Sequence, residues 1–145
     1  MSGVDEIILE LPAEFASLGD DDGGRRRWMA PDGTYVMAQA VLPPEEAEGC
    51  AEAADLVMAT NLGTLSVERG ADVAIMGAVP IVGANEARAA RVKFQTVTGE
   101  LVDAVVVVMA RAGEVVLVHI IWPADDSEDR ASMAVGICES LRFGS

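Results

Sequence analysis

The most apolar stretch of the chain, residues 101–122 (LVDAVVVVMARAGEVVLVHIIW), has a turn signal near its centre. Its many valines are β-branched and suit a pleated, packed surface better than a helix. Ala112 and Gly113 divide the stretch into two apolar runs, so the pattern predicts a hairpin with a two-residue loop. Charged residues interrupt the stretch, whereas a membrane-spanning helix needs about 20 mostly apolar residues. We therefore expect no membrane insertion.

Both faces of this predicted hairpin are apolar. With a two-residue loop, Arg111 lies opposite Glu114, and the same register places Asp103 opposite Trp122. One face then carries Val105, Val107, Met109, Val116, Val118, Ile120 and Trp122, and the other carries Val102, Ala104, Val106, Val108, Val115, Leu117, His119 and Ile121. A hairpin with one solvated face would alternate apolar and polar residues. We therefore expect an α+β fold in which helices flank both faces of an antiparallel β-sheet, an α/β/α sandwich.

The N-terminal part of the chain alternates strand and turn signals. Apolar residues at 4–11 predict a first strand, whose acidic residues favour an edge position. Residues 12–18 predict a short helical turn. The turn sequence PDG at 31–33 predicts a second hairpin that joins residues 25–30 to residues 34–42.

Two amphipathic helices are expected to cover the sheet. From Pro43, acidic residues in the first turn and apolar residues on one face predict a helix that ends at Gly63. After Pro123, capping residues and helical apolar spacing predict a second helix that ends near Phe143. Further strands are expected at residues 64–68, 73–77 and 86–98.

Length and charge limit the possible functions. With 145 residues, the chain is expected to form one domain, residues 1–145. Its formal net charge of -14 argues against nucleic acid, because phosphate binding depends on clustered Lys and Arg. The same charge favours a protein partner with basic residues. The N-terminal sequence MSGVDEIILEL lacks the basic and apolar regions of a secretory signal, so we expect a cytoplasmic protein.

Candidate chemistry centres on one histidine. His119, Asp103 and Trp122 all belong to the predicted hairpin, and together they form a candidate ligand site. His119 stands between Leu117 and Ile121, which is more typical of a core histidine than of a catalyst. No serine stands in a nucleophile elbow, and no metal-binding or cofactor motif is present. We therefore expect no enzyme, no metal and no cofactor.

A second candidate site lies at the start of the predicted second hairpin. Arg25, Arg26 and Arg27 precede Trp28, and this basic and aromatic group suits stacking or the binding of an anionic group on a partner. The acidic residues 20–22 are close enough in sequence to neutralise it. A solvated strand end is the favoured interpretation of the arginine run, because charge runs usually face water.

The order of the predicted elements resembles that of a known superfamily. The first strand ends in LPAEF, and the C-terminal part, VVLVHIIWPADDSEDRASMAVGICESLRF, joins a strand, an acidic loop and a helix that ends in Ser140, Leu141, Arg142 and Phe143. This order is similar to that of the PsbP-like superfamily. The superfamily includes the photosystem oxygen-evolving subunit, Ran-release-factor proteins, LpqN-type lipoproteins and bacterial adaptor or chaperone domains.

The resemblance implies an antiparallel sheet between helices that acts in protein binding or assembly. It transfers no active site to this chain. We therefore expect a non-catalytic, bacterial protein-binding module, adaptor or chaperone-like, that is a monomer or a homodimer. The alternative is a small-molecule-binding protein or small enzyme with a pocket near His119.

Overall fold

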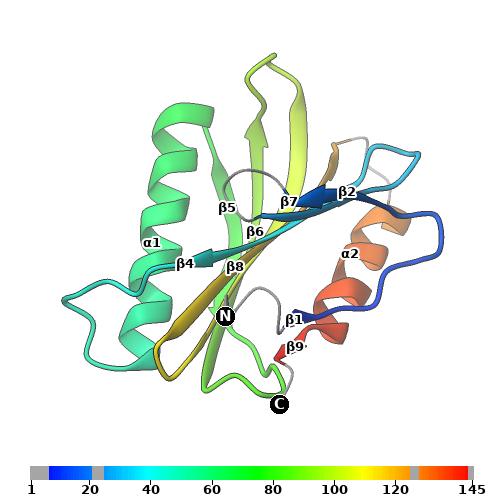
Figure 1. Ribbon diagram of the computed structural model, residues 1–145. Coiled ribbons are helices and arrows are strands. Elements are labelled where there is room, and N and C mark those ends of the chain that lie inside the picture. The colour runs from blue at the N-terminus through cyan, green and yellow to red at the C-terminus, as the bar shows by residue number, and fades with distance from the viewer. Residues whose placement is uncertain (1–6, 21–24, 125–127, 144–145) are drawn as a thin grey trace.

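The computed structural model describes residues 7–20, 25–124 and 128–143. Seven strands form one antiparallel sheet in the order β2-β3-β4-β8-β7-β6-β5, and β1 pairs with β9 in a separate two-stranded sheet (Figure 1). The elements are β1 (Ile7–Ile8), β2 (Ala16–Asp20), β3 (Arg26–Met29), β4 (Tyr35–Val41), α1 (Cys50–Arg69), β5 (Asp72–Ala78), β6 (Glu86–Gln95), β7 (Leu101–Arg111), β8 (Glu114–Pro123), α2 (Glu128–Ser140) and β9 (Arg142–Phe143).

The predicted central hairpin is confirmed in both its turn and its register. Strands β7 and β8 pair from Arg111 opposite Glu114 to Asp103 opposite Trp122. Gly113 has a φ of 76°, a conformation that glycine adopts without steric cost. The hairpin lies in the middle of the sheet, with β4 on one side and β6 on the other. Its side chains therefore reach the centre of both faces.

Two hydrophobic cores lie on opposite faces of this sheet. On one face, Val106 and Val108 pack with Met58 of α1. On the other, Val107 and Trp122 pack with residues of α2 and with β1 and β9. Figure 1 shows the two helices on opposite sides of the sheet. The expected α/β/α sandwich is confirmed. Each helix buries one apolar face of the hairpin and so removes that face from water.

The first helix differs from its prediction at both ends. It begins at Cys50 rather than at Pro43, and it continues through Gly63 to Arg69. Residues 64–68, predicted as a strand, belong to this helix. A glycine inside a helix costs only about 1 kcal/mol relative to alanine, which the packing of a buried apolar face outweighs. The helix ends instead at Gly70, which has the left-handed φ of 62°.

The N-terminal predictions are partly wrong. Within residues 4–11, the described strand is β1 alone, and it pairs with β9 instead of forming an edge of the large sheet; residues 4–6 lie outside the described part. Of the helical turn predicted at 12–18, one turn is present at residues 12–15, where the Phe15 N–H donates to the carbonyl oxygen of Pro12 at 3.1 Å, and residues 16–18 belong instead to β2, which pairs with β3. A strand here completes hydrogen bonds that β3 would otherwise leave open on its outer side.

The second predicted hairpin is confirmed and consists of β3 and β4. The strands predicted at 73–77 and 86–98 are confirmed as β5 and β6. In the turn between β3 and β4, the Thr34 backbone N–H donates to Oδ1 of Asp32 at 2.9 Å. This hydrogen bond is the main reason that the pKa of Asp32 is lowered. Oδ2 of Asp32 lies 3.5 Å from Nε of Arg130, which connects the turn to α2.

The last helix ends earlier than predicted. It stops at Ser140, and the chain turns so that Phe143 forms part of β9. The capping residues predicted at 125–127 lie outside the described residues. The backbone N–H of Phe143 donates to the carbonyl oxygen of Val82 at 2.9 Å, so the C-terminal segment contacts the loop between β5 and β6.

Gly83 tests the packing of this C-terminal contact. Its φ is 86°, and a Cβ atom there would lie 2.7 Å from the carbonyl oxygen of Phe143. We expect Gly83→Ala to lower the free energy of unfolding by about 3 kcal/mol, because backbone strain adds to overpacking. Gly99 has a φ of 88°, and no atom lies within 4 Å of the position that a Cβ atom would take there. Gly99→Ala should therefore cost only the strain, about 1 kcal/mol. Urea unfolding measures both variants, and equal losses would contradict the steric contact.

Candidate functional site

The three residues of the predicted ligand site do not come together. Asp103 and Trp122 are register partners on β7 and β8, as predicted. Successive residues of a strand point to opposite faces, so His119 lies on the face opposite to Trp122. Trp122 packs in the core beneath α2, whereas His119 contacts α1. One small ligand therefore cannot contact His119 together with Asp103 and Trp122, because His119 lies on the opposite face of the sheet.

His119 is a structural contact between the sheet and α1. Its Nε2 lies 3.2 Å from Oδ1 of Asn61, and the neutral tautomer with a proton on Nε2 donates to this oxygen. Burial lowers the pKa of His119 to about 4. The imidazole is therefore neutral at neutral pH, and the hydrogen bond satisfies a polar group that has lost most of its water.

Asp103 and Trp122 lie at the end of the hairpin with two basic neighbours on β6. Nζ of Lys93 lies 3.9 Å from Oδ1 of Asp103. The guanidinium carbon of Arg91 lies 5.3 Å from the centre of the Trp122 ring, within the range of a cation–π contact. Trp122 itself is only 2% exposed. These contacts account for both residues structurally, and ligand binding by them stays a prediction.

The basic group that precedes and begins β3 is divided between the two faces of the sheet. The Arg26 guanidinium lies 5.0 Å from the centre of the Trp28 ring and donates to the carbonyl oxygen of Ile7 at 3.3 Å. Arg27 points to the other face and donates to the carbonyl oxygen of Leu18 at 3.4 Å. Trp28 packs partly against the core beneath α2. Arg25 precedes the strand, and partner binding by these four residues stays a prediction.

The largest of four hollows described on the surface lies between α2 and the sheet. It has a volume of about 560 Å³, and we call it the α2 hollow. Apolar side chains predominate among its lining residues, which are Val79, Pro80, Ile81, Ala89, Val105, Val107, Val135, Cys138 and Glu139. Glu139 is the one ionisable carboxylate in this set and is exposed. This volume and lining suit apolar side chains or a small apolar ligand.

A second hollow, the α1 hollow, lies between α1 and β5. It has a volume of about 360 Å³ and is lined by Asp55, Met58, Ala59, Leu62, Met76, Gly77, Ala78 and Arg88. Nε of Arg88 lies 2.8 Å from Oδ1 of Asp55, and its Nη1 lies 2.9 Å from Oε2 of Glu86. These two carboxylates raise the pKa of Arg88. The hollow therefore has apolar walls and a charged group that is already paired.

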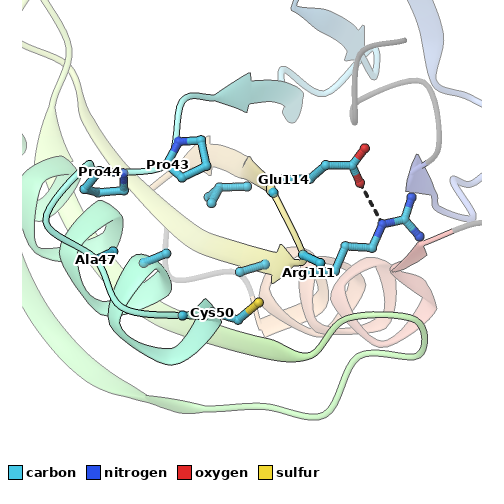
Figure 2. A pocket seen from close by; sticks show the side chains of 12 residues that line it. Pro43, Pro44, Ala47, Cys50, Arg111 and Glu114 are labelled. Carbon is cyan, nitrogen blue, oxygen red and sulfur yellow. Dashed lines mark hydrogen bonds and ion pairs between the residues drawn. The ribbon is translucent and has the colours of Figure 1, made fainter.

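Two further hollows also adjoin α1. Figure 2 shows one of about 360 Å³, between the β7–β8 turn and the segment that precedes α1, with Pro43, Ala47 and Cys50 on its wall. At its rim, Nε of Arg111 lies 2.7 Å from Oε2 of Glu114. The other, of about 290 Å³, is lined in part by Asn61, the partner of His119. None of the four hollows is lined by His119, Asp103 or Trp122.

The thiol of Cys138 is held in its unreactive, protonated form. Burial, and then the charge of Glu139, raise the pKa of the Cys138 thiol to about 12, so little thiolate exists at neutral pH. Cys138 and Cys50 are both free cysteines. Across residues 7–20, 25–124 and 128–143, no three His, Cys, Asp or Glu side chains gather as a metal site would require. Neither described helix is long and apolar enough to cross a membrane.

Sequence reasoning missed the two hollows beside β5. Their walls come from segments far apart in the chain, such as Met58 and Met76, or Ala89 and Val135. Val135 and Met76 are exposed apolar residues, and a single exposed apolar residue is common on protein surfaces. Only the packing of α1 and α2 on β5, β6 and β7 brings these residues together.

His119 gives a testable pH dependence. Its pKa lies near 4 in the folded chain and near 6.5 when unfolded, so the unfolded chain takes up the proton first as the pH falls. We expect the wild type to lose up to about 3 kcal/mol of stability from this group between pH 7.5 and pH 4. His119→Gln keeps a polar group beside Asn61 and does not titrate. Urea unfolding at several pH values compares the two chains, and identical pH slopes would contradict the buried neutral imidazole.

Comparisons with known proteins support the fold. By sequence, the chain matches no protein-family model and no curated protein. By structure, it is similar to LpqN of Mycobacterium tuberculosis, with a TM-score of 0.66 and 16% identity over 96% of this chain and 83% of LpqN. It is also similar to a variant of Mog1, with a TM-score of 0.65 and 11% identity over 95% of this chain and 90% of Mog1.

A third solved structure extends this similarity. The cyanobacterial PsbP of Synechocystis sp. PCC 6803 has a TM-score of 0.62 and 10% identity, over 96% of this chain and 87% of PsbP. Each of the three similarities covers nearly all of this chain. The chain therefore has the PsbP-like fold, as the order of elements in its sequence indicates.

Proposed function

We propose that this chain is a non-catalytic protein-binding module, adaptor or chaperone-like, that holds a partner against its apolar hollows. The α2 hollow carries this proposal. Its volume of about 560 Å³ is large enough for several apolar side chains, and its walls are mostly apolar. The one thiol there, Cys138, is kept protonated, and its one carboxylate, Glu139, lies at an exposed position.

The shared fold is consistent with this role. LpqN is described as involved in cell envelope biogenesis, and the folds of LpqN, Mog1 and PsbP fit a binding or adaptor role. Because one fold hosts unrelated functions, the surface of this chain must carry the argument. The distance of His119 from the largest hollow, on the other face of the sheet, favours binding over histidine-based catalysis.

Charge indicates the kind of partner. The net charge of -14 attracts a protein with basic residues and repels nucleic acid. Complementary charge raises the association rate, while the apolar contacts keep the complex together. A cytoplasmic location in a bacterium and a monomeric or homodimeric free state belong to the same proposal.

Val135 offers a direct test of the α2 hollow. It is 46% exposed on the wall of the hollow, so Val135→Lys should fold normally but place a charge among apolar side chains. Val67, 88% exposed on α1, gives the matched control Val67→Lys. In pull-downs from native lysate, we expect the wild type and Val67→Lys to retain the same partner and Val135→Lys to lose it. A wild type that stays without a partner at native abundance would contradict the proposed function.

A further inference from the structure

We propose that the outer edge of β5 receives an extended, basic segment of the partner as an additional strand of the sheet. This inference rests on the proposed protein-binding function and names the place and conformation of the partner. It makes two claims that the proposed function does not. The partner's backbone bonds to β5, and its side chains alternate between the α1 hollow and the α2 hollow.

Strand β5 has little of what usually protects an edge: its register irregularity lies near its start, between Val73 and Ile75, and residues 76–78 pair regularly with β6. It is the last strand of the seven-stranded sheet, and among the described residues no segment pairs with its outer side. It has seven residues, and Asp72 is its one charged residue; neither Lys nor Pro occurs in it. Met76 is 60% exposed. An exposed, apolar strand of this length is a template for pairing with another chain.

The register shows which backbone groups of β5 are available. The Val79 backbone N–H donates to the carbonyl oxygen of Ala87 at 3.1 Å, so Val79 and Ala87 form a hydrogen-bonded pair. In an antiparallel ladder such pairs alternate with non-bonded pairs, which makes Gly77 opposite Ala89 the next bonded pair. Met76 and Ala78 therefore direct their N–H and C=O groups away from β6, toward the open edge.

The two hollows lie on opposite faces beside this edge. Met76 and Ala78 line the α1 hollow. Val79, directly after β5, lines the α2 hollow, together with Ala89, the cross-strand partner of Gly77. Because successive side chains of a strand point to opposite faces, an added strand would present alternate side chains to the two hollows. Backbone bonds then provide affinity, and the hollows provide specificity.

Charge complementarity distinguishes the occupant from a second copy of this chain. Each hollow carries a carboxylate, Asp55 in the α1 hollow and Glu139 in the α2 hollow. Arg88, the one cation lining either hollow, is already bonded to Asp55 and Glu86. A second copy would bring another net charge of -14 to the same edge, which opposes pairing. A segment that places apolar side chains on both of its faces, against the walls of the two hollows, and a Lys or Arg near the exposed Glu139 fits this edge.

The probe for this edge is a random peptide library displayed on phage, with linear inserts of about nine residues. Inserts of this length are long enough to form one added strand. After selection on the wild-type chain, we expect enriched peptides with apolar residues at adjacent positions, one for each hollow, together with Lys or Arg. Binding of a synthetic enriched peptide is then measured by calorimetry at low salt and at about 0.15 M salt. In the complex, amide exchange at Met76 and Ala78 should slow, because their outward N–H groups become hydrogen-bonded.

Two edge variants test the backbone and the surface separately. Ala78→Pro removes one outward N–H and leaves the hydrogen bond of Val79 in place, and Met76→Lys places a charge on the edge. We expect each to weaken peptide binding by about tenfold or more, as loss of a hydrogen bond or desolvation of a charge implies. Leu42, 90% exposed after β4 on the other half of the sheet, gives the control Leu42→Lys, which should bind normally.

The outcomes separate this inference from the proposed function. Equal peptide binding by the wild type, Met76→Lys and Ala78→Pro would overturn strand addition, while a partner retained in the lysate experiment would leave protein binding intact. Failure to enrich any peptide would also overturn it. A concentration-dependent dimer that Met76→Lys abolishes would show a second copy at this edge, and would overturn the assignment to a basic partner segment.

Discussion

Burial of the β7–β8 hairpin on both faces is the constraint on which the rest of this structure depends. Adjacent residues such as Val106 and Val107 point to opposite faces, and each is at most 1% exposed. One helix cannot cover both faces, so α1 and α2 are each required to complete the sheet. In the sequence, α1 stands before the central strands and α2 after them.

The helices cover the central strands better than the outer ones. Helix α1 packs on β6 and β7, and the α1 hollow remains between it and β5. On the other face, α2 packs over the hairpin, and the α2 hollow remains beside Ala89 and Val79. His119, the one histidine, is hydrogen-bonded in place by Asn61. The largest of the four described hollows and the α1 hollow therefore lie toward the β5 side of the sheet.

The same packing explains why the predicted site residues were not brought together. Their sequence positions on one hairpin suggested a common site, but an offset of three residues between His119 and Trp122 places them on opposite faces. The basic group at residues 25–27 is divided in the same way by the alternation of β3. Residues of one strand share a face only when they are an even number of positions apart. His119 and Trp122 do not have this spacing, and neither do successive residues of the basic group.

The sequence by itself determined the hairpin, its turn at Ala112 and Gly113, its register and its two apolar faces, because each depends on local periodicity and turn chemistry. It also determined that both faces needed helices. Only the tertiary structure decided that α1 continues through Gly63, that β5 is the edge strand, and that Gly83 packs against Phe143. These features depend on contacts between distant segments, whose energies outweigh local propensity and leave no local pattern in the sequence.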